Sequence, residues 1–398
     1  MMQKQYDIII VGAALVGTSA AVELTKQGFK VALVDRKMPV FSSEANQANN
    51  NPNKNNENWD SRIYAISPGN ADWLKSLGVW QRMDAARVTD ICGMKIWADA
   101  NTEALNFDAD DVHAENLGYI LENTNLHHAL WATLQDLGIE VIVGECDDLD
   151  FSSEIVSLSM QDGTCLMAPL IVAADGGSSW VREQAGLTQD KTVYEHVGVV
   201  ANFETELPHH GVARQWFVED GILAWLPLSG NKISIVFSSK NAEALMAMGD
   251  AALADYIAQA GGYALGNLRC ITPPAAFPLV KQNASALIGD RLALIGDAAH
   301  QVHPMAGQGV NLGFRDVVEL VHVLAERNPL ADIGDPFVLR RYERARKADV
   351  LGMQGLTHGL YGVFDSQQAW VKALRNWALT VPNHSATLKR SLMKHALI

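Results

Sequence analysis

The chain has 398 residues, of which 48% are hydrophobic, and its net charge is −14. This length and apolar content are sufficient for a large buried core that divides into two lobes. The acidic balance argues against a nucleic-acid partner, and no apolar run reaches the roughly 18 residues that a membrane span needs.

Histidine and cysteine patterns favour a metal-free protein of a reducing compartment. His209 and His210 are adjacent and have no third ligand at a suitable spacing, and neighbouring side chains of an extended chain point apart, so we expect no metal. The four cysteines form no Cys-x-x-Cys pair. The N-terminus enters a strand pattern directly, without a secretory leader, so we expect a cytoplasmic location.

A nucleotide-binding pattern opens the chain. An apolar strand over residues 6–11 leads into Gly12-Ala-Ala-Leu-Val-Gly17 and an apolar-periodic helix, and a second strand over residues 29–34 ends at Asp35. A β-α-β unit with an acid about 20 residues beyond the glycines is the layout of a dinucleotide site. FAD and NAD both fit this layout.

Individual residues of this unit have distinct expected roles. Gly12 would make the tight turn, and Gly17 would allow the helix to pack closely on the strand. Asp35, followed by Arg36, would bind the ribose of the adenosine half. Ala14 stands where a glycine normally lets the backbone approach the pyrophosphate, and we expect its methyl group to force a small shift without abolishing binding.

Three further segments are predicted in chain order. Residues 46–58 contain eight asparagines and almost nothing apolar, which predicts a solvated surface loop. The apolar run over residues 169–174 predicts a strand that ends at Asp175, a residue that could simply cap the next turn. Residues 193–237 are strand-rich, and their Trp216 and Trp225 are expected mainly to pack in the core of a sheet.

The most informative segment lies near the C-terminal third. A short buried strand, 291–295, precedes Gly296-Asp297-Ala-Ala-His300, and a Gly-rich turn then leads into a helix with apolar residues at helical spacing from Val310 to Leu324. The N–H groups and the dipole of a helix N-terminus suit a group that becomes negative, such as a reduced flavin ring. There is no second Gly-x-Gly-x-x-Gly unit, so a nicotinamide would visit the flavin and leave.

Taken together, these motifs resemble those of a known family. The order GxAxxG, DG followed by SxVR, and GDAAH with HPxxGQGxN is similar to the single-component flavin aromatic hydroxylases, which include para-hydroxybenzoate hydroxylase. The resemblance is closest to the ubiquinone-biosynthesis hydroxylases. It extends over nearly the whole chain through segments similar to DxRxxALS, LGxW, LGYxxEN, LPL and FPL at residues 60–67, 77–80, 117–123, 226–228 and 277–279.

The resemblance implies an α/β fold in which a Rossmann-like FAD-binding domain is interleaved with a smaller β-sheet substrate domain. The expected FAD-binding segments are 1–85, 120–185 and 280–335, and the expected substrate-domain segments are 86–119 and 186–279. Residues 336–398 would form a helical region that packs on the FAD domain, with a membrane or partner contact as the alternative. Basic residues in this tail slightly favour an anionic surface or an acidic partner.

Site residues follow from the same resemblance. Asp297 would bind a ribityl hydroxyl, and Pro304 would lie beside the ring face where oxygen reacts. His303 would lie near the isoalloxazine or hold its loop, and Arg62 would lie near the flavin or its phosphates. The remaining implied cofactor contacts are Gly296, Gly307, Gln308, Gly309, Val310, Asn311, Glu122 and Asp175. Glu122 departs from relatives that place Gln or Arg there, since a carboxylate cannot donate to a phosphate, and Arg182 would assist the nicotinamide or serve as a salt-bridge partner.

The implied reaction is ring hydroxylation. NADPH or NADH would reduce FAD, O2 would add at flavin C4a, and the resulting hydroperoxide would transfer oxygen to an electron-rich phenol in a site that excludes water. The implied substrate is a polyprenylated phenol of ubiquinone biosynthesis. It would be met at a peripheral membrane surface, at the inner face of the membrane, or in a quinone-biosynthesis complex, and the protein could be a homo-oligomer.

Two other functions remain open from sequence. One is a flavin-dependent reductase of the same fold, and the other is a non-catalytic subunit of a quinone-biosynthesis complex. Ala14 and Glu122 are the features that favour the second of these.

Overall fold

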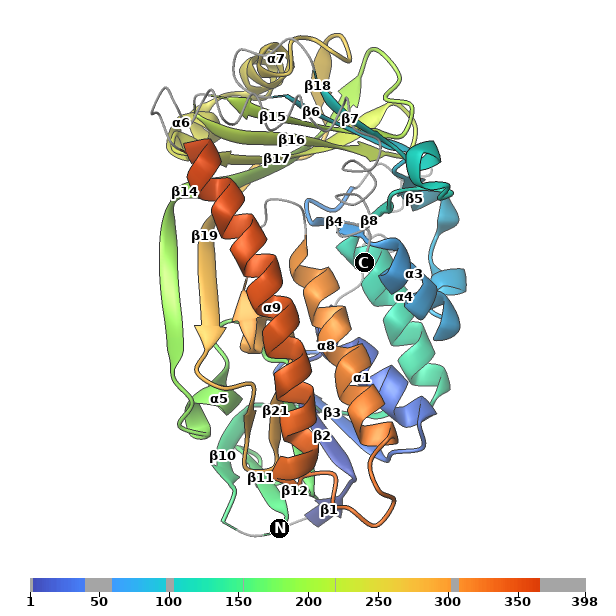
Figure 1. Cartoon of the computed structure of the whole chain (residues 1–398), viewed down its shortest axis with the longest axis vertical. Coiled ribbons are helices and arrows are strands. Elements are labelled where there is room, and N and C mark those ends of the chain that lie inside the picture. Colours follow the sequence, from blue (N-terminus) through green and yellow to red (C-terminus); the bar gives the residue numbers. More distant parts are fainter. Residues whose placement is uncertain are drawn as a thin grey trace.

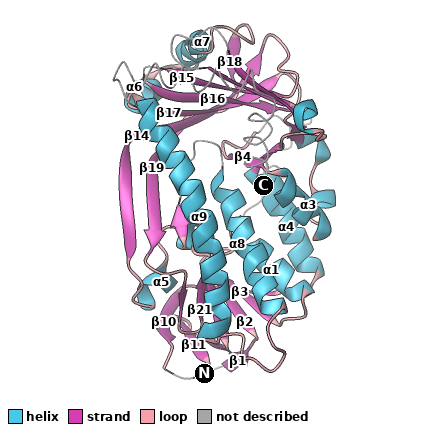
Figure 2. Ribbon diagram, in the orientation of Figure 1, coloured by secondary structure: helices cyan, strands magenta, loops and turns pink. Residues whose placement is uncertain are grey.

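The computed structural model describes residues 3–39, 59–97, 104–152, 154–218, 220–301 and 308–365, with side chains as far as residue 352 except that of Gln308 (Figure 1). The asparagine-rich segment 46–58 lies outside these residues. A mixed α/β structure results, as predicted, with helices and sheets segregated into layers (Figure 2).

A six-stranded sheet holds the predicted nucleotide-binding unit. Its strand order is β20-β21-β13-β2-β3-β9, and all its neighbours are parallel except β20 and β21. β2, β13 and β21 are buried throughout, because both faces of a parallel sheet are covered. The strands are β2 (Ile8–Val11), β3 (Val31–Asp35), β9 (Glu140–Val143), β13 (Leu170–Ala173), β20 (Ile288–Gly289) and β21 (Leu292–Leu294).

Helices cover one side of this sheet. α1 (Leu15–Lys26) packs between α4 (Asn123–Asp136) and α8 (Gln308–Ala325), and α9 (Pro336–Asp365) packs on α8, as Figure 1 shows. The predicted helices after the two Gly-rich turns are therefore confirmed, and so is a helix from Pro336 onward. A four-stranded sheet contributes to the same core with β1 (Gln3–Gln5), β10 (Cys146–Asp150), β11 (Val156–Met160) and β12 (Cys165–Ala168).

A nine-stranded sheet forms the other layer. Most of it lies at the top of Figure 2, and its two longest strands extend down the left side. The helices α6 (Ala242–Ala247) and α7 (Asp250–Ala260) cover its outer face. Its strands are β6 (Gly93–Trp97), β7 (Leu105–Asp108), β14 (Gln189–Thr205), β15 (Val212–Val218), β16 (Gly221–Leu228), β17 (Lys232–Ser239), β18 (Leu268–Cys270), β19 (Ala275–Ala284) and β22 (His300–Gln301).

The tryptophans of this sheet pack in its outer core. Trp216 stacks on Trp97 with ring centroids 4.8 Å apart, and Trp225 meets Trp216 edge-on at 4.6 Å. Both belong to the cluster under α6 and α7. The prediction of core packing is confirmed for these two residues, which leaves the inner face of the sheet to other side chains.

A three-stranded sheet lies between the two layers. It consists of β4 (Ile63–Ile66), β8 (Tyr119–Glu122) and β5 (Val88–Asp90). The remaining described α-helices are the short α3 (Pro68–Ser76) and α5 (Trp180–Gln184). All strands of the six-stranded sheet fall in the three expected FAD-binding segments. The nine-stranded sheet reaches past the expected boundary at residue 279, because β19 continues alongside β14 as far as Ala284 and β22 adds to its edge. We propose the same domain division with β19 and β22 moved to the substrate sheet.

Within the described residues, no helix combines the length and apolar character needed to cross a membrane.

Candidate active site

Glycines shape the turn between β2 and α1. Gly12 has a φ of +109°, and a Cβ there would lie 2.3 Å from the carbonyl oxygen of Ala174. A Cβ on Gly17 would lie 1.8 Å from the carbonyl oxygen of Gly12. The tight turn at Gly12 and the close packing at Gly17 are therefore confirmed as structural features, and β2 and β13 end side by side as a result.

The N-terminus of α1 is open to an anion. Ala14 is its exposed N-cap, no side chain caps the helix, and no acid lies in the first turn. The backbone N–H of Ala13 donates to Asp35 Oδ2 at 2.7 Å, which brings the strand-end acid to the same turn, while Arg36 is exposed. An uncapped helix start beside an acid has the donors for a pyrophosphate and the acceptor for a ribose.

Ala14 does not depart from the glycine pattern in backbone conformation. Its φ is −76° and its ψ is −175°, which any residue adopts. Only its methyl group separates it from glycine, so it leaves the cofactor-binding prediction intact.

We predict that Ala14→Gly tightens FAD binding by about two- to tenfold, equivalent to at most about 1.4 kcal/mol. The methyl group is exposed where the backbone would approach the pyrophosphate, and glycine is also the better N-cap residue. Fluorescence titration of the apoprotein with FAD measures the change. Weaker binding by the variant would show that the methyl group makes a favourable contact.

The turn before α8 presents a second set of backbone groups. Gly296, with a φ of +59°, donates its N–H to Asp316 Oδ2 at 2.8 Å. Asp297 is exposed beyond β21, and Gln301 donates to its carboxylate at 3.0 Å. Among the described residues, no atom would lie within 4 Å of a Cβ on Gly309, so none of them packs against the first turn of α8 there. His303, Pro304 and Gly307 lie outside the described residues.

The side chains of Asn311 and Val310 have protein neighbours that were not predicted. Asn311 is fully buried, accepts hydrogen bonds from Ser67 N and Asn70 Nδ2, each at 2.9 Å, and donates to Ala65 O at 2.7 Å. The side chain of Val310 lies in the core. The inward face of α8 thus holds β4 and α3, and the expected flavin contact of these two residues stays a prediction.

Glu122 also has another partner. Its buried carboxylate forms an ion pair with Arg87, whose Nη2 lies 2.8 Å from Oε1, and it accepts the N–H of Asp60 at 2.6 Å. Arg87 in turn stacks on Trp59 at 4.3 Å. These contacts make Glu122 an anchor for residues 59–62, and its expected contact with the cofactor stays a prediction.

Asp175 and Arg182 join the two strand-end turns. Asp175 Oδ2 accepts the N–H of Val181 at 3.1 Å, as the cap interpretation predicts, and burial raises the pKa of Asp175. Its other oxygen is buried without a hydrogen-bond partner among the described residues. Buried Arg182 donates to Ala298 O and Gly177 O, each at 2.9 Å. It thus ties the Asp-Gly turn to the GDAAH segment.

A buried charge network under the GDAAH segment was not predicted. Asp316 of α8 is 2.8 Å from His300 Nε2 and 2.6 Å from Arg346 Nε of α9. Burial alone would raise the pKa of Asp316, but His300 and Arg346 hold it below its ordinary value. The sequence does contain a signal for the burial of Asp316. This residue lies four positions from both Leu312 and Leu320, on the apolar stripe of α8.

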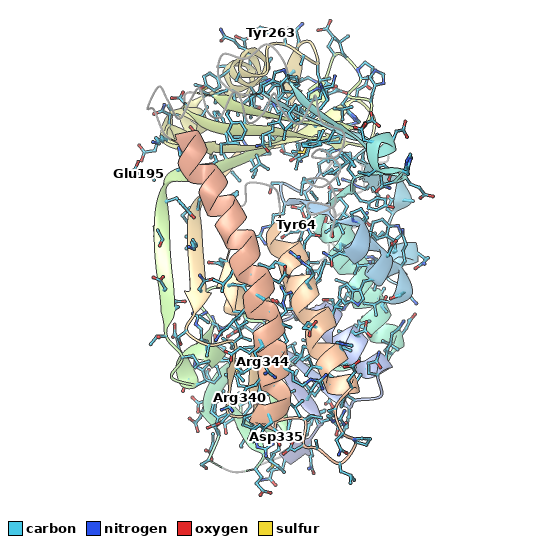
Figure 3. All side chains as sticks on the ribbon, in the orientation of Figure 1. Tyr64, Glu195, Tyr263, Asp335, Arg340 and Arg344 are labelled. Atoms are coloured by element: carbon cyan, nitrogen blue, oxygen red, sulfur yellow. The ribbon has the colours of Figure 1, made fainter. Side chains whose placement is uncertain are left out.

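Two further residues at the site were missed. His127 Nε2 lies 2.8 Å from Ala13 O behind the Gly-rich turn, and burial lowers the pKa of His127. Tyr64 on β4 lies near the start of α8 and below the nine-stranded sheet (Figure 3). Burial and, more weakly, Asp297 raise the pKa of Tyr64, while exposed Arg62 opposes them. No periodicity or motif distinguishes either residue in the sequence.

Comparison with known proteins identifies the family. Residues 5–353 match the FAD binding domain family. The chain is 32% identical to 3-demethoxyubiquinol 3-hydroxylase of Escherichia coli, with all of both chains covered, and 30% identical to ubiquinone hydroxylase UbiL of Rhodospirillum rubrum over 99% of this chain and 90% of that protein. The chain belongs to the FAD-dependent ubiquinone-biosynthesis hydroxylases. It is a flavoprotein monooxygenase, and FAD is its cofactor.

Solved structures support the fold. The p-nitrophenol 4-monooxygenase of Pseudomonas putida superposes with a TM-score of 0.76 at 19% identity and covers 100% of this chain and 99% of its own. Klebsiella pneumoniae HpxO, solved with FAD and uric acid, gives a TM-score of 0.75 at 16% identity, with 100% and 97% covered. The uncapped α1 N-terminus and the acid at the end of β3 fit FAD bound along the strand ends.

Proposed function

We propose that this protein hydroxylates the aromatic ring of a polyprenylated phenol in ubiquinone biosynthesis, with NADPH or NADH as reductant and O2 as oxidant. The full-length similarity to 3-demethoxyubiquinol 3-hydroxylase supports this substrate class. A reductase of the same fold and a non-catalytic subunit receive no support from the relatives' names.

One structural observation carries the proposal. The segment from Asp60 to Asn70 is held from both layers: Asn311 of α8 donates to Ala65 O, and Asn202 of β14 donates to Asp60 O at 2.9 Å. The same short segment therefore contacts both the N-terminal end of α8, where we propose that the flavin binds, and the nine-stranded sheet. A substrate held against that sheet would lie next to the ring.

The chain's own residues have these proposed roles. The α1 N-terminus binds the pyrophosphate, Asp35 the ribose and Asp297 a ribityl hydroxyl, while the α8 N-terminus and Gly309 offer backbone N–H groups to the negative edge of the reduced ring. Bound FAD supplies the chemistry of oxygen activation. The apolar cluster of Ile120, Ala213 and Leu228 between β8 and the sheet helps to exclude water from the reacting groups.

The proposed setting is a membrane surface. A polyprenyl tail partitions into lipid, so the protein would work as a peripheral protein at the inner face of the membrane, alone, as a homo-oligomer or in a quinone-biosynthesis complex.

The proposal is tested with purified, FAD-loaded protein, a short-chain prenylated phenol, NAD(P)H and isotopically labelled O2. We expect substrate-stimulated NAD(P)H oxidation with one labelled oxygen in the ring of the product, found by mass spectrometry. Oxidation of NAD(P)H with a reduced, unlabelled product would favour the reductase. Protein that cannot be reconstituted with FAD would favour the non-catalytic subunit. Deletion of the gene should remove quinone and leave one under-hydroxylated precursor.

A further inference from the structure

The outer face of α9 carries an exposed row of aromatic, basic and aliphatic side chains. Phe337 is 76% exposed and Leu351 is 67% exposed, and Arg340 and Arg344 between them are exposed as well. At the pitch of an α-helix these four positions project within an arc of about 60° and extend over about 21 Å of the helix axis. We call these four residues the α9 stripe.

The α9 stripe lies opposite the side of the helix that packs on the protein. Buried Tyr342 donates to Leu294 O of β21 at 2.7 Å, and buried Arg346 pairs with Asp316 of α8. These contacts fix the rotation of α9 about its axis, so the stripe is turned toward solvent. In Figure 3, Arg340 and Arg344 lie one above the other along the lower half of α9.

The two arginines of the stripe have no carboxylate partner among the described residues, since the ion pairs of α9 there involve other side chains. Arg340 lies over the ring of Phe337 at 5.6 Å, and Arg344 Nε is 3.3 Å from the backbone oxygen of Arg340. Like charges four residues apart on a helix repel each other. An anion from outside the chain would relieve this repulsion.

The acids next to the stripe already have partners. Glu326 pairs with Arg341 at 2.9 Å, and Glu343 pairs with Lys347 at 2.8 Å. Asp335 accepts a backbone N–H at the start of the helix at 2.8 Å. The stripe therefore keeps two uncompensated positive charges in a protein whose net charge is −14.

This combination fits the headgroup region of an anionic bilayer. Guanidinium groups bind phosphate oxygens with two parallel hydrogen bonds, and aromatic and aliphatic side chains on the same helix face enter the acyl boundary beside them. An acidic protein would also neutralise the arginines. The polyprenyl tail of the proposed substrate partitions into lipid, however, which favours a lipid surface as the partner.

We infer that the α9 stripe docks the protein on an anionic phospholipid surface, with Arg340 and Arg344 on lipid phosphates and with Phe337 and Leu351 at the acyl boundary. The choice of a lipid partner rests on the proposed function, and the inference adds the face that meets the membrane. Because the protein as a whole is acidic, its other faces are repelled by the same surface, so the stripe also sets the orientation.

The test uses the FAD-loaded full chain without substrate, and vesicles of phosphatidylcholine alone or mixed with phosphatidylglycerol. Co-sedimentation measures the bound protein. Wild type should prefer the mixed vesicles by at least about tenfold, as expected for two basic residues on an anionic surface. This preference should fall as the salt concentration rises, because salt screens exposed charges.

Two variants of the stripe separate its charge from its apolar part. Arg340→Ala combined with Arg344→Ala should weaken binding to the mixed vesicles by about ten- to thirtyfold. Phe337→Ala should weaken it by about three- to tenfold at every salt concentration, since this contribution is apolar. Both should keep the FAD content and the unfolding temperature of wild type, because the replaced side chains are exposed.

Lys95→Ala combined with Lys191→Ala is the matched control. Both lysines are exposed, on β6 and β14, and their loss changes the net charge by the same amount as the loss of the two arginines. This variant should bind the mixed vesicles as wild type does. An equal loss in the lysine and arginine variants would overturn the inference, because total charge and not the stripe would then control binding.

Two further outcomes would also overturn it. Equal binding of wild type to both kinds of vesicle would remove the role of the anionic lipid, and binding to neither would leave the stripe to an acidic protein. The proposed function is measured separately, with a short-chain phenol and labelled O2 in the absence of vesicles, where the arginine variant should turn over as wild type does. If the stripe binds mixed vesicles but no labelled oxygen enters the product, the proposed function fails and the docking face stands.

Discussion

Asp316→Asn is expected to lower the free energy of unfolding by about 3–5 kcal/mol, the cost of breaking a buried ion pair. Asp316 is 0% exposed and receives three groups: His300, Arg346 and the N–H of Gly296. Asparagine cannot neutralise the buried guanidinium of Arg346. Because the same carboxylate holds the turn before α8, the variant should also retain less FAD on purification.

The effect depends on pH in a defined direction. The pKa of Asp316 is lowered in the folded protein, so its stabilisation is complete above the ordinary aspartate value of about 4 and is lost as the pH falls through the lower folded pKa. Urea unfolding at neutral pH and in acid measures this dependence. The difference in the free energy of unfolding between wild type and Asp316→Asn should be smaller in acid.

Asp349→Asn is the control for this variant. Asp349 pairs with Arg315 and Arg346 but its own side chain is 31% exposed. Water can therefore partly replace its carboxylate, and its loss should lower the free energy of unfolding by less than the loss of Asp316 does. Equal losses for the two variants would mean that burial of the charge does not determine its contribution.

Gly12→Ala is expected to cost about 1–3 kcal/mol in backbone strain and a further 1–3 kcal/mol in overpacking, and to lose most bound FAD. The φ of Gly12 is +109°, and the added Cβ would lie 2.3 Å from Ala174 O and 2.8 Å from Asp175 N. The two strand ends must then separate at the turn that receives the pyrophosphate. Chemical unfolding and the flavin-to-protein absorbance ratio measure the two effects.

Gly28→Ala separates strain from collision. Gly28 has a similar φ of +92°, but a Cβ there would meet no atom within 4 Å. Gly28→Ala should lower the free energy of unfolding by the backbone strain alone, about 1–3 kcal/mol, and should retain its FAD. If both variants behave alike, the close approach of β2 and β13 at Gly12 is not what shapes the cofactor turn.

Local sequence patterns were enough for the elements on which the cofactor site is built. The strand, turn and helix around Gly12 and those around Gly296 were predicted from apolar periodicity and from glycines, and these depend on interactions between residues close in the chain. The packing of Trp216 and Trp225 was also predicted, because β-branched and aromatic residues in alternating strands are usually core.

Side-chain partners far apart in sequence were not predictable. Glu122 pairs with Arg87, and Asn311 binds Ser67, Asn70 and Ala65, and none of these partners was predicted. A motif indicates which residue type occurs at a position. It does not state which of several nearby groups that residue will satisfy.

The sequence by itself determined the fold class, the FAD-binding family and the two Gly-rich turns that would hold the ends of the cofactor. Only the tertiary structure decided that Asp316, His300 and Arg346 form one buried network. The physical reason is the distance along the chain between the residues that interact. Turns and helices are set by local conformational preferences, whereas the partner of a buried polar group is chosen by whichever distant strand or helix the packing of the core brings against it.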